Sequence, residues 1–203
     1  MLVTALRRAL GPKKALTLAY YPDAKQEAAL AAGNFARDVD LMHAMSYDAP
    51  GAQHAPRALA DSVIANARAA GLPLHKVTVG LPFYGRAAKT GEWTTYEDLV
   101  QRHAPLAHGV DAVPAPGGGG DTIGFNGIDT LVAKTRAALA AGAGGVMIWE
   151  AGQDCRTVAV TRGGATHGVT CPGGRADSLL AAVWDAVVAA NATAARAAAG
   201  GEL

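Results

Sequence analysis

The chain lacks both a strong imbalance of charge and an apolar run of membrane-spanning length. Its 203 residues include 18 Lys and Arg against 17 Asp and Glu, which gives a formal net charge of +1. This balance gives no electrostatic reason to expect nucleic acid or an anionic membrane as a partner. A membrane-spanning helix needs about 20 predominantly apolar residues, and no segment approaches that length. We therefore expect neither partner.

Motifs for metal and phosphate binding are also missing. The six histidines show no HExxH or comparable ligand spacing. Two glycine-rich runs, at 117–120 and 142–145, lack the Lys-Ser/Thr pair of a P-loop, and the second run precedes an apolar segment instead of following one. We expect flexible loops at both runs, no metal site and no cofactor.

The amino-terminal segment does not have the pattern of a signal peptide. Residues 1–10 are basic and alternate apolar and polar side chains at helical spacing, but they carry no small-residue cleavage site. We interpret residues 2–10 as a helix that ends at the Gly11-Pro12 pair.

Cysteine is scarce. Only Cys155 and Cys171 are present, on either side of a loop rich in Gly and Thr. A disulfide closing a loop of this size would remove roughly 3 kcal/mol of conformational freedom from the unfolded chain in an oxidising compartment. Cysteines in a loop have little reason to be buried as apolar side chains, and so the sequence favours the bond. Two unpaired thiols in a reducing cytosol are the alternative.

The chain does contain a fourfold alternation of strand and helix. The expected strands are 15–21, 39–47, 77–84 and 145–149, and the expected helices are 2–10, 24–32, 56–70, 126–141 and 176–194. Strands that are apolar on both faces, each followed by a helix, predict a parallel sheet with right-handed crossovers. The expected fold class is therefore α/β, built from parallel βα units.

Polar side chains stand at the carboxyl end of each expected strand, as they do around a barrel. A complete TIM barrel needs eight strands and about 250 residues, whereas this sequence offers four strands and opens with a helix. The pattern is that of the later half of a TIM barrel, strands five to eight. Ligands of such folds bind at the carboxyl ends of the strands.

Three of these strand ends carry distinctive motifs, namely 45–48 (MSYD), 79–86 (VGLPFYGR) and 145–150 (GVMIWE). In this order they resemble the sixth, seventh and eighth strand ends of the family-18 glycoside hydrolases, which are chitinases and chitinase-like lectins. The resemblance runs from about residue 2 to residue 184. It implies a partial barrel domain over residues 1–195 with an insertion at 87–124, and residues 196–203 are expected to form a disordered tail.

The resemblance also implies roles for single residues. The family cuts β-1,4-linked N-acetylglucosamine polymers and uses the acetamido oxygen of the substrate as nucleophile. The Tyr47 hydroxyl would hold the acetamido group and the cyclised intermediate, and Trp149 would form an apolar floor under the sugar. The other sugar-binding residues that the resemblance implies are Met45, Asp48, Tyr84, Arg86 and Met147. A cis peptide is expected between Trp149 and Glu150.

The catalytic acid is where the sequence departs from the family. Family-18 catalysis uses the fourth-strand motif Asp-x-x-Asp-x-Asp-x-Glu, whose last residue protonates the leaving oxygen, and this sequence contains no such motif. The nearest segment, 38–42 (DVDLM), has Met42 in the place of the acid. Glu150 should face away from the pocket that Trp149 lines, because adjacent strand residues point to opposite faces. We therefore expect Glu150 to support the site and not to replace the acid.

The insertion adds further candidates. Residues 94–97 (TTYE) have the pattern of a capping box at the start of a short helix. Insertions of the family can wall the sugar groove, and so Trp93 and Tyr96 are either sugar platforms or parts of a small core of the insertion itself.

Two interpretations from different classes follow. One is a partial chitinase domain that is inactive as this isolated chain. The other is a non-catalytic, lectin-like protein that binds chitin oligosaccharides. Both have N-acetylglucosamine oligomers or polymers as partner, and a full-length parent would be extracellular or in the secretory pathway. The open edges and inner faces of a half barrel also predict self-association.

Overall fold

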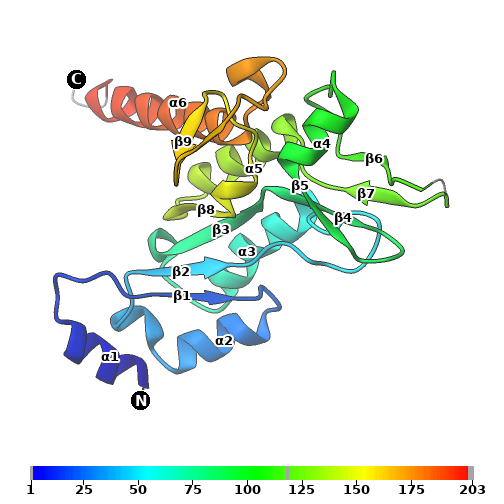
Figure 1. Ribbon diagram of the computed structural model, residues 1–203. Coiled ribbons are helices and arrows are strands. Elements are labelled where there is room, and N and C mark those ends of the chain that lie inside the picture. The colour runs from blue at the N-terminus through cyan, green and yellow to red at the C-terminus, as the bar shows by residue number, and fades with distance from the viewer. Residues whose placement is uncertain (1, 118, 201–203) are drawn as a thin grey trace.

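The computed structural model of the chain describes residues 2–117 and 119–200. It contains a four-stranded parallel sheet with helices packed on it and a smaller antiparallel sheet beside it (Figure 1). The parallel sheet has the order β1-β2-β3-β8. Its strands are β1 (Thr17–Tyr20), β2 (Leu41–Ala44), β3 (Val77–Pro82) and β8 (Gly145–Trp149). All three neighbouring pairs are parallel, which confirms the predicted α/β fold of parallel βα units.

Among the described residues, the five helices expected around the strands are present, and so is the short helix expected within the insertion. They are α1 (Leu2–Leu10), α2 (Lys25–Ala32), α3 (Arg57–Ala69), α4 (Tyr96–His103), α5 (Ile128–Ala140) and α6 (Leu179–Gly200). Short 3₁₀ helices are η1 (Phe35–Arg37), η2 (Leu74–Lys76), η3 (Ala151–Gln153) and η4 (Gly174–Asp177). Gly71 follows α3 with φ +72°, a left-handed conformation that glycine adopts without strain.

Helix α6 is longer than predicted. It continues to Gly200, through the first part of the tail 196–203 for which disorder was expected. Residues 201–203 of that tail lie outside the described residues. No helix in the described part of the chain is both long enough and apolar enough to span a bilayer.

The antiparallel sheet has the order β5-β4-β7-β6. Its strands are β4 (Tyr84–Ala87), β5 (Trp93–Thr95), β6 (Ala112–Pro114) and β7 (Thr122–Gly124). The predicted strand 77–84 was wrong in one respect, because the chain leaves the parallel sheet after Pro82 and Tyr84 begins β4. Leu81 and Phe83, on the two sides of Pro82, are both fully buried. The sequence is therefore apolar on both sides of the point where the chain changes sheets, and its pattern does not reveal the change.

Two clusters of buried side chains join these layers. On the helix-covered face of the parallel sheet, Met42 and Val79 pack with Val63 of α3. A second cluster joins the small sheet to α4, α5 and α6 and includes Phe83, Leu99, Phe125, Leu131 and Leu179. The insertion is thus packed firmly onto the carboxyl end of the parallel sheet.

The segment between β8 and α6 contains the hairpin of β9 (Val160–Arg162) and β10 (Ala165–His167). A disulfide between Cys155 and Cys171 closes this segment, with a Cα–Cα distance of 5.0 Å. The bond is the outcome that the sequence favoured over two unpaired thiols.

Candidate functional site

Side chains from three strand ends meet at one edge of the parallel sheet. Tyr47 and Asp48 follow β2, and Trp149 is the last residue of β8. Tyr84 and Arg86 lie on β4, directly after β3. Because the three strands are parallel, their carboxyl ends share this edge, where Pro82 of β3 stands in register with Trp149. The structure therefore brings together residues that are far apart in the sequence.

A hollow of about 460 Å³ opens at this edge. It is lined by Asp48, Tyr84, Arg86, Gly91, Trp93, Trp149, Glu150 and Gln153. Trp149 and Trp93 are 53% and 64% exposed, and so a large part of each residue is accessible to a ligand. The volume falls within the roughly 300–1,000 Å³ typical of small-molecule sites.

The other predicted residues lie beside this hollow and do not line it. Tyr47 packs edge-on against Tyr84, with ring centroids 6.1 Å apart, and the side chains of Met45 and Met147 pack against this pair. Burial, together with the negative charge of Asp48, raises the pKa of Tyr47 to about 12. Tyr47 therefore keeps its hydroxyl proton at neutral pH and can donate a hydrogen bond.

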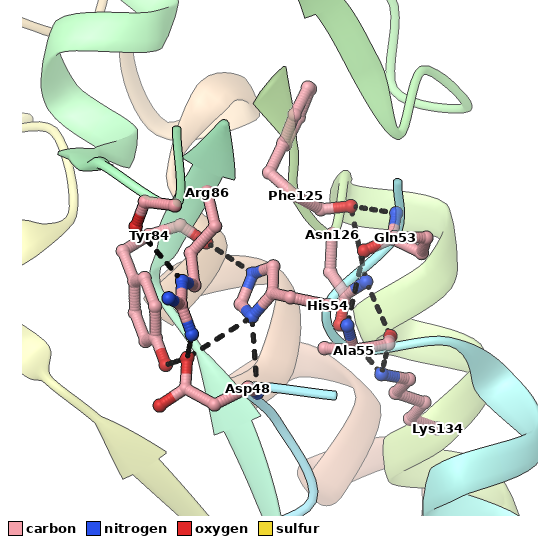
Figure 2. Close-up of polar contacts among 10 residues, drawn as sticks. Asp48, Gln53, His54, Ala55, Tyr84, Arg86, Phe125, Asn126 and Lys134 are labelled. Carbon is pink, nitrogen blue, oxygen red and sulfur yellow. Dashed lines mark hydrogen bonds and ion pairs between the residues drawn. The ribbon is translucent and has the colours of Figure 1, made fainter. Parts of the chain in front are cut away.

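Asp48 lines the hollow, and polar groups from Tyr84, Arg86 and His54 converge on it (Figure 2). Its Oδ1 atom accepts hydrogen bonds from the Tyr84 hydroxyl at 2.8 Å and from Nη1 of Arg86 at 3.1 Å. The backbone of Asp48 has φ +62°, a left-handed conformation that aspartate tolerates better than most residues. Burial and the bond to Asp48 raise the pKa of Tyr84 above its usual range. The three side chains thus present one ion pair and one hydroxyl to the hollow.

His54 supports Asp48 from behind. Its Nδ1 atom accepts the N–H of Asp48 at 3.3 Å, and its Nε2 atom lies 3.2 Å from the carbonyl oxygen of Tyr84. Burial lowers the pKa of His54 to about 4, so that the ring is neutral at pH 7, with the proton assigned to Nε2. Nδ1 also lies 3.7 Å from Oδ1 of Asp48, but a nitrogen without a proton forms no ion pair there. This role of His54 could not be predicted from the sequence, because a single histidine in a loop fits no motif.

The prediction that Glu150 faces away from the hollow was wrong. Glu150 lines the hollow together with Trp149. The alternation of faces holds only within a strand, and β8 ends at Trp149 while Glu150 belongs to the turn that leads into η3. The expected cis peptide between Trp149 and Glu150 is present.

Of the two aromatic residues of the insertion, one is placed to contact a ligand and the other belongs to the core. Trp93 is exposed and lines the hollow. Tyr96 is 3% exposed and packs 6.3 Å from Phe125 in the core. Gln153 is a further residue of the hollow, and the sequence analysis missed it because no motif marks it.

This arrangement is suited to binding. Aromatic side chains pair an apolar face with polar neighbours, and the Asp48–Arg86 pair offers charge-assisted hydrogen bonds. Oδ1 of Asp48 already accepts two hydrogen bonds from the chain, from Tyr84 and Arg86, and so these three side chains are held in one arrangement at the hollow. Within the described residues, no group of three or more His, Cys, Asp or Glu side chains is placed to hold a metal ion.

Comparison with known proteins gives a consistent result. The model of the glycosyl hydrolases family 18 matches residues 1–154. The family-18 chitinase ChiB of Flavobacterium johnsoniae is 25% identical, with a TM-score of 0.61 over 75% of this chain and 49% of that chain. No curated protein sequence matches this chain significantly.

Two further solved structures share the fold at lower identity. Chitinase ChiA74 of Bacillus thuringiensis is 18% identical, with a TM-score of 0.69 over 93% of this chain and 39% of that chain. A mutant of a plant class V chitinase from Cycas revoluta, in complex with (GlcNAc)3, is 19% identical, with a TM-score of 0.59 over 75% of this chain and 57% of that chain. The present chain spans about half the length of these proteins.

Proposed function

Because the chain belongs to glycosyl hydrolase family 18, we propose that its hollow binds oligomers or polymers of β-1,4-linked N-acetylglucosamine. The observation that carries the proposal is the exposed indole of Trp149, which shares one hollow with Asp48, Tyr84 and Arg86. The face of an indole suits the C–H groups of a sugar ring, while carboxylate, hydroxyl and guanidinium groups suit its hydroxyl and acetamido groups. The structural neighbour in complex with (GlcNAc)3 supports this class of ligand.

Each residue has a distinct role in this proposal. Trp149 is the floor under one sugar, and Trp93 extends the aromatic surface to a neighbouring sugar. Asp48, Tyr84 and Arg86 form hydrogen bonds with hydroxyl or acetamido groups. Tyr47 holds the acetamido group of the sugar at the cleavage position, and Met45 and Met147 fix the position of Tyr47 by packing.

For the reaction, we propose that the chain is part of a chitinase domain and supplies its sugar-binding side. Hydrolysis through the acetamido group needs an acid that protonates the leaving oxygen, and the Asp-x-x-Asp-x-Asp-x-Glu motif is not in this sequence. The isolated chain should therefore release no reducing ends from N-acetylglucosamine oligomers. Measurable turnover by the pure chain would contradict this proposal.

A lectin-like function is the second candidate, and the same hollow favours it. It predicts binding of N-acetylglucosamine oligomers without hydrolysis as the natural function of the protein. Sugar binding alone does not separate the two candidates. Hydrolysis that begins when a polypeptide carrying the missing carboxylate motif is added would favour the chitinase domain, and unchanged binding without turnover would favour the lectin.

Binding is tested by titrating the chain with the trimer and pentamer of N-acetylglucosamine while following tryptophan fluorescence. The unmodified chain should show saturable quenching or enhancement. Trp149→Ala should weaken binding by about tenfold or more, in keeping with loss of about 1–3 kcal/mol of stacking and burial. Trp184→Ala is the matched control, because Trp184 is 62% exposed on α6 and does not line the hollow.

The affinities of the two variants and the unmodified chain decide whether the proposed binding is correct. Weak binding in Trp149→Ala with normal binding in Trp184→Ala supports the proposal. Equal affinities in all three proteins, or no fluorescence change with the unmodified chain at millimolar sugar, would refute it.

We also propose that the chain associates with itself and that its full-length parent is secreted. Within the described residues, β1 and β8 each have one edge without a neighbouring strand. Exposed apolar side chains repeat at every fourth residue on both outer helices, namely Leu2, Leu6 and Leu10 on α1 and Leu180, Trp184 and Val188 on α6. Unpaired strand edges and rows of exposed apolar side chains favour association between copies of a chain. Sedimentation velocity should show dimers or larger species at micromolar concentration, and a single monomer boundary at all concentrations would contradict this.

The disulfide is the support for secretion, because such bonds persist in oxidising compartments.

A further inference from the structure

The loop between β2 and α3, residues 45–56, is held in place by buried polar groups from outside the hollow (Figure 2). The carbonyl oxygen of Ala55 accepts hydrogen bonds from Nζ of Lys134 at 2.6 Å and from Nδ2 of Asn126 at 3.0 Å. Lys134 also donates to Oδ1 of Asn126 at 2.6 Å. Ala55, Asn126 and Lys134 are at most 1% exposed. One carbonyl of the loop is therefore clamped by two side chains in the protein interior.

Lys134 is an unusual residue for the middle of a packed helix. It forms no ion pair in the described part of the chain and has only two neutral oxygens as partners. Burial lowers its pKa to about 8, while the charges around it come from Asp111 before β6 and from Arg57 and Asp61 of α3. A buried amine is costly unless it is hydrogen-bonded. The hydrogen bonds to Ala55 and Asn126 therefore offset the cost of burying this amine, which an apolar side chain of the same size would not incur.

A second set of bonds ties the same loop to the end of the insertion. Nε2 of Gln53 donates to the carbonyl oxygens of Asp111 at 3.1 Å and of Phe125 at 2.7 Å. Oε1 of Gln53 accepts the N–H of Ala55 at 3.2 Å. The loop also approaches Gly124 so closely that a Cβ atom there would overlap the carbonyl oxygen of Ala52. The residues on both sides of His54 are thus fixed.

His54 connects these fixed points to the hollow. Its ring accepts the N–H of Asp48 and contacts the carbonyl oxygen of Tyr84, and it packs on the Tyr84 ring with centroids 4.8 Å apart. Movement of Gln53 or Ala55 would therefore shift the ring of His54. Asp48 would then lose the support of its backbone and, with it, the geometry of its bonds to Tyr84 and Arg86.

We propose that Lys134 and Asn126 are positioning residues, which hold His54 and thereby fix the Asp48 carboxylate at the sugar-binding hollow. This inference rests on the proposed sugar binding. Neither residue lines the hollow, and their effect on a ligand is exerted entirely through the 45–56 loop.

The test compares two lysine-to-methionine substitutions. Lys134→Met removes one of the two side chains that bond to the Ala55 carbonyl, together with the bond to Asn126, and keeps a side chain of similar length. Lys76→Met is the matched control, because Nζ of Lys76 also donates to two neutral oxygens, which are the backbone carbonyls of Ala36 and Val39 at 2.7 and 2.9 Å. Lys76 precedes β3 and therefore lies at the amino end of the sheet, opposite the hollow.

Two measurements are made on each protein. The first is the affinity for the N-acetylglucosamine pentamer, which Lys134→Met should weaken by about fivefold to tenfold and Lys76→Met should leave within about twofold. The second is the pH titration of the His54 ring by NMR in the absence of sugar. His54 should titrate near its unmodified value in Lys76→Met and move towards the ordinary value in Lys134→Met, because a loosened loop admits water to the ring.

Unchanged His54 titration and unchanged affinity in a folded Lys134→Met protein would overturn the inference. If Lys134→Met does not fold, Gln53→Ala replaces it, since Gln53 is only half-buried and ties the same loop. Gln53→Ala should move both readouts in the same direction, and failure to move either would again overturn the inference. If the unmodified chain binds no sugar, the proposed function fails, while the sugar-free titration of His54 still decides whether the clamp positions the loop.

Discussion

Asp48 forms hydrogen bonds with three other residues at the hollow. Its carboxylate accepts hydrogen bonds from Tyr84 and Arg86, and its N–H donates to His54. The ion pair with Arg86 joins side chains that are 47% and 35% exposed, and exposed pairs contribute only about 0–1 kcal/mol to stability. We infer that this carboxylate contributes more to ligand binding than to folding.

Asp48→Asn tests this separation. Asparagine tolerates the same backbone conformation but has no negative charge with which to hold Arg86. We expect the affinity for N-acetylglucosamine oligomers to fall by about tenfold and the free energy of unfolding to change by at most about 1 kcal/mol. Fluorescence titration and urea unfolding measure the two quantities. A variant that binds normally but is clearly less stable would reverse the assignment.

His54 makes stability depend on pH. The side chain is 2% exposed, and its pKa is about 4 in the folded chain against 6.5 ordinarily. Between these pH values the unfolded chain binds a proton that the folded chain does not. The free energy of unfolding should therefore fall as the pH drops from 6.5 towards 4, by on the order of 3 kcal/mol from this residue. Stability from this source is fully present above pH 6.5.

Urea unfolding at several pH values checks this expectation by comparing the unmodified chain with His54→Gln. Glutamine does not titrate, and so its variant should show a flatter pH dependence between 4 and 6.5, whatever its stability at pH 7. Parallel curves for the two proteins would show that His54 is not the group responsible.

At the scale of single elements, helix α4 starts one residue later than the capping-box pattern predicts. The pattern would make Thr94 the N-cap, but Oγ1 of Thr95 accepts the N–H of Asp98 at 3.0 Å. Glu97, which the pattern would turn back to the helix start, forms an ion pair with Arg156 at 2.6 Å. Glu97 thus forms an ion pair with Arg156 of another segment, and the capping box that its position predicts is not formed.

Paired substitutions test which threonine caps the helix. Thr95→Ala should lower the free energy of unfolding by about 1 kcal/mol, because an N-cap hydrogen bond is lost. Thr94→Ala should cost less than half as much. Thermal or urea unfolding of both variants decides the matter, and equal losses would contradict the assignment.

The elements themselves were largely predictable from the sequence. Four apolar runs predicted the four strands of the parallel sheet, and the helices expected around these strands are present. Two of the wrong predictions concern places where the hydrophobic pattern of a segment does not show which part of the fold packs against it. The change of sheet at Pro82 is hidden because both sheets bury the adjacent side chains, and Glu150 turns into the hollow because the strand ends before it.

The prediction of the site was uneven for a related reason. The strand-end motifs identified Asp48, Tyr84, Arg86 and Trp149, which line one hollow. The groups that hold the hollow from behind were missed, because a lysine in a helix and a lone histidine in a loop are usually solvated or isolated. Only the packing of α5 against the 45–56 loop shows that Lys134 and His54 are buried and bonded.

At the scale of the whole molecule, the disulfide joins the segment that follows β8 and η3 to the segment that precedes η4 and α6. It closes a loop with a sequence separation of 16 residues, and cross-links of this span stabilise by roughly 3 kcal/mol. Reduction, or the double substitution Cys155→Ala and Cys171→Ala, should lower the free energy of unfolding by about that amount. Urea unfolding with and without reductant measures it. An identical midpoint in both conditions would show that the bond contributes nothing.

The clamp on the 45–56 loop also bears on the thermodynamics of ligand capture. A flexible rim must be immobilised when a ligand arrives, and each ordered side chain costs about 0.5–1.5 kcal/mol of entropy. Here the backbone beneath Asp48 is already immobilised by interior hydrogen bonds before any ligand arrives. The backbone beneath Asp48 is therefore preorganised, and a ligand that binds there would lose less affinity to the ordering of this loop.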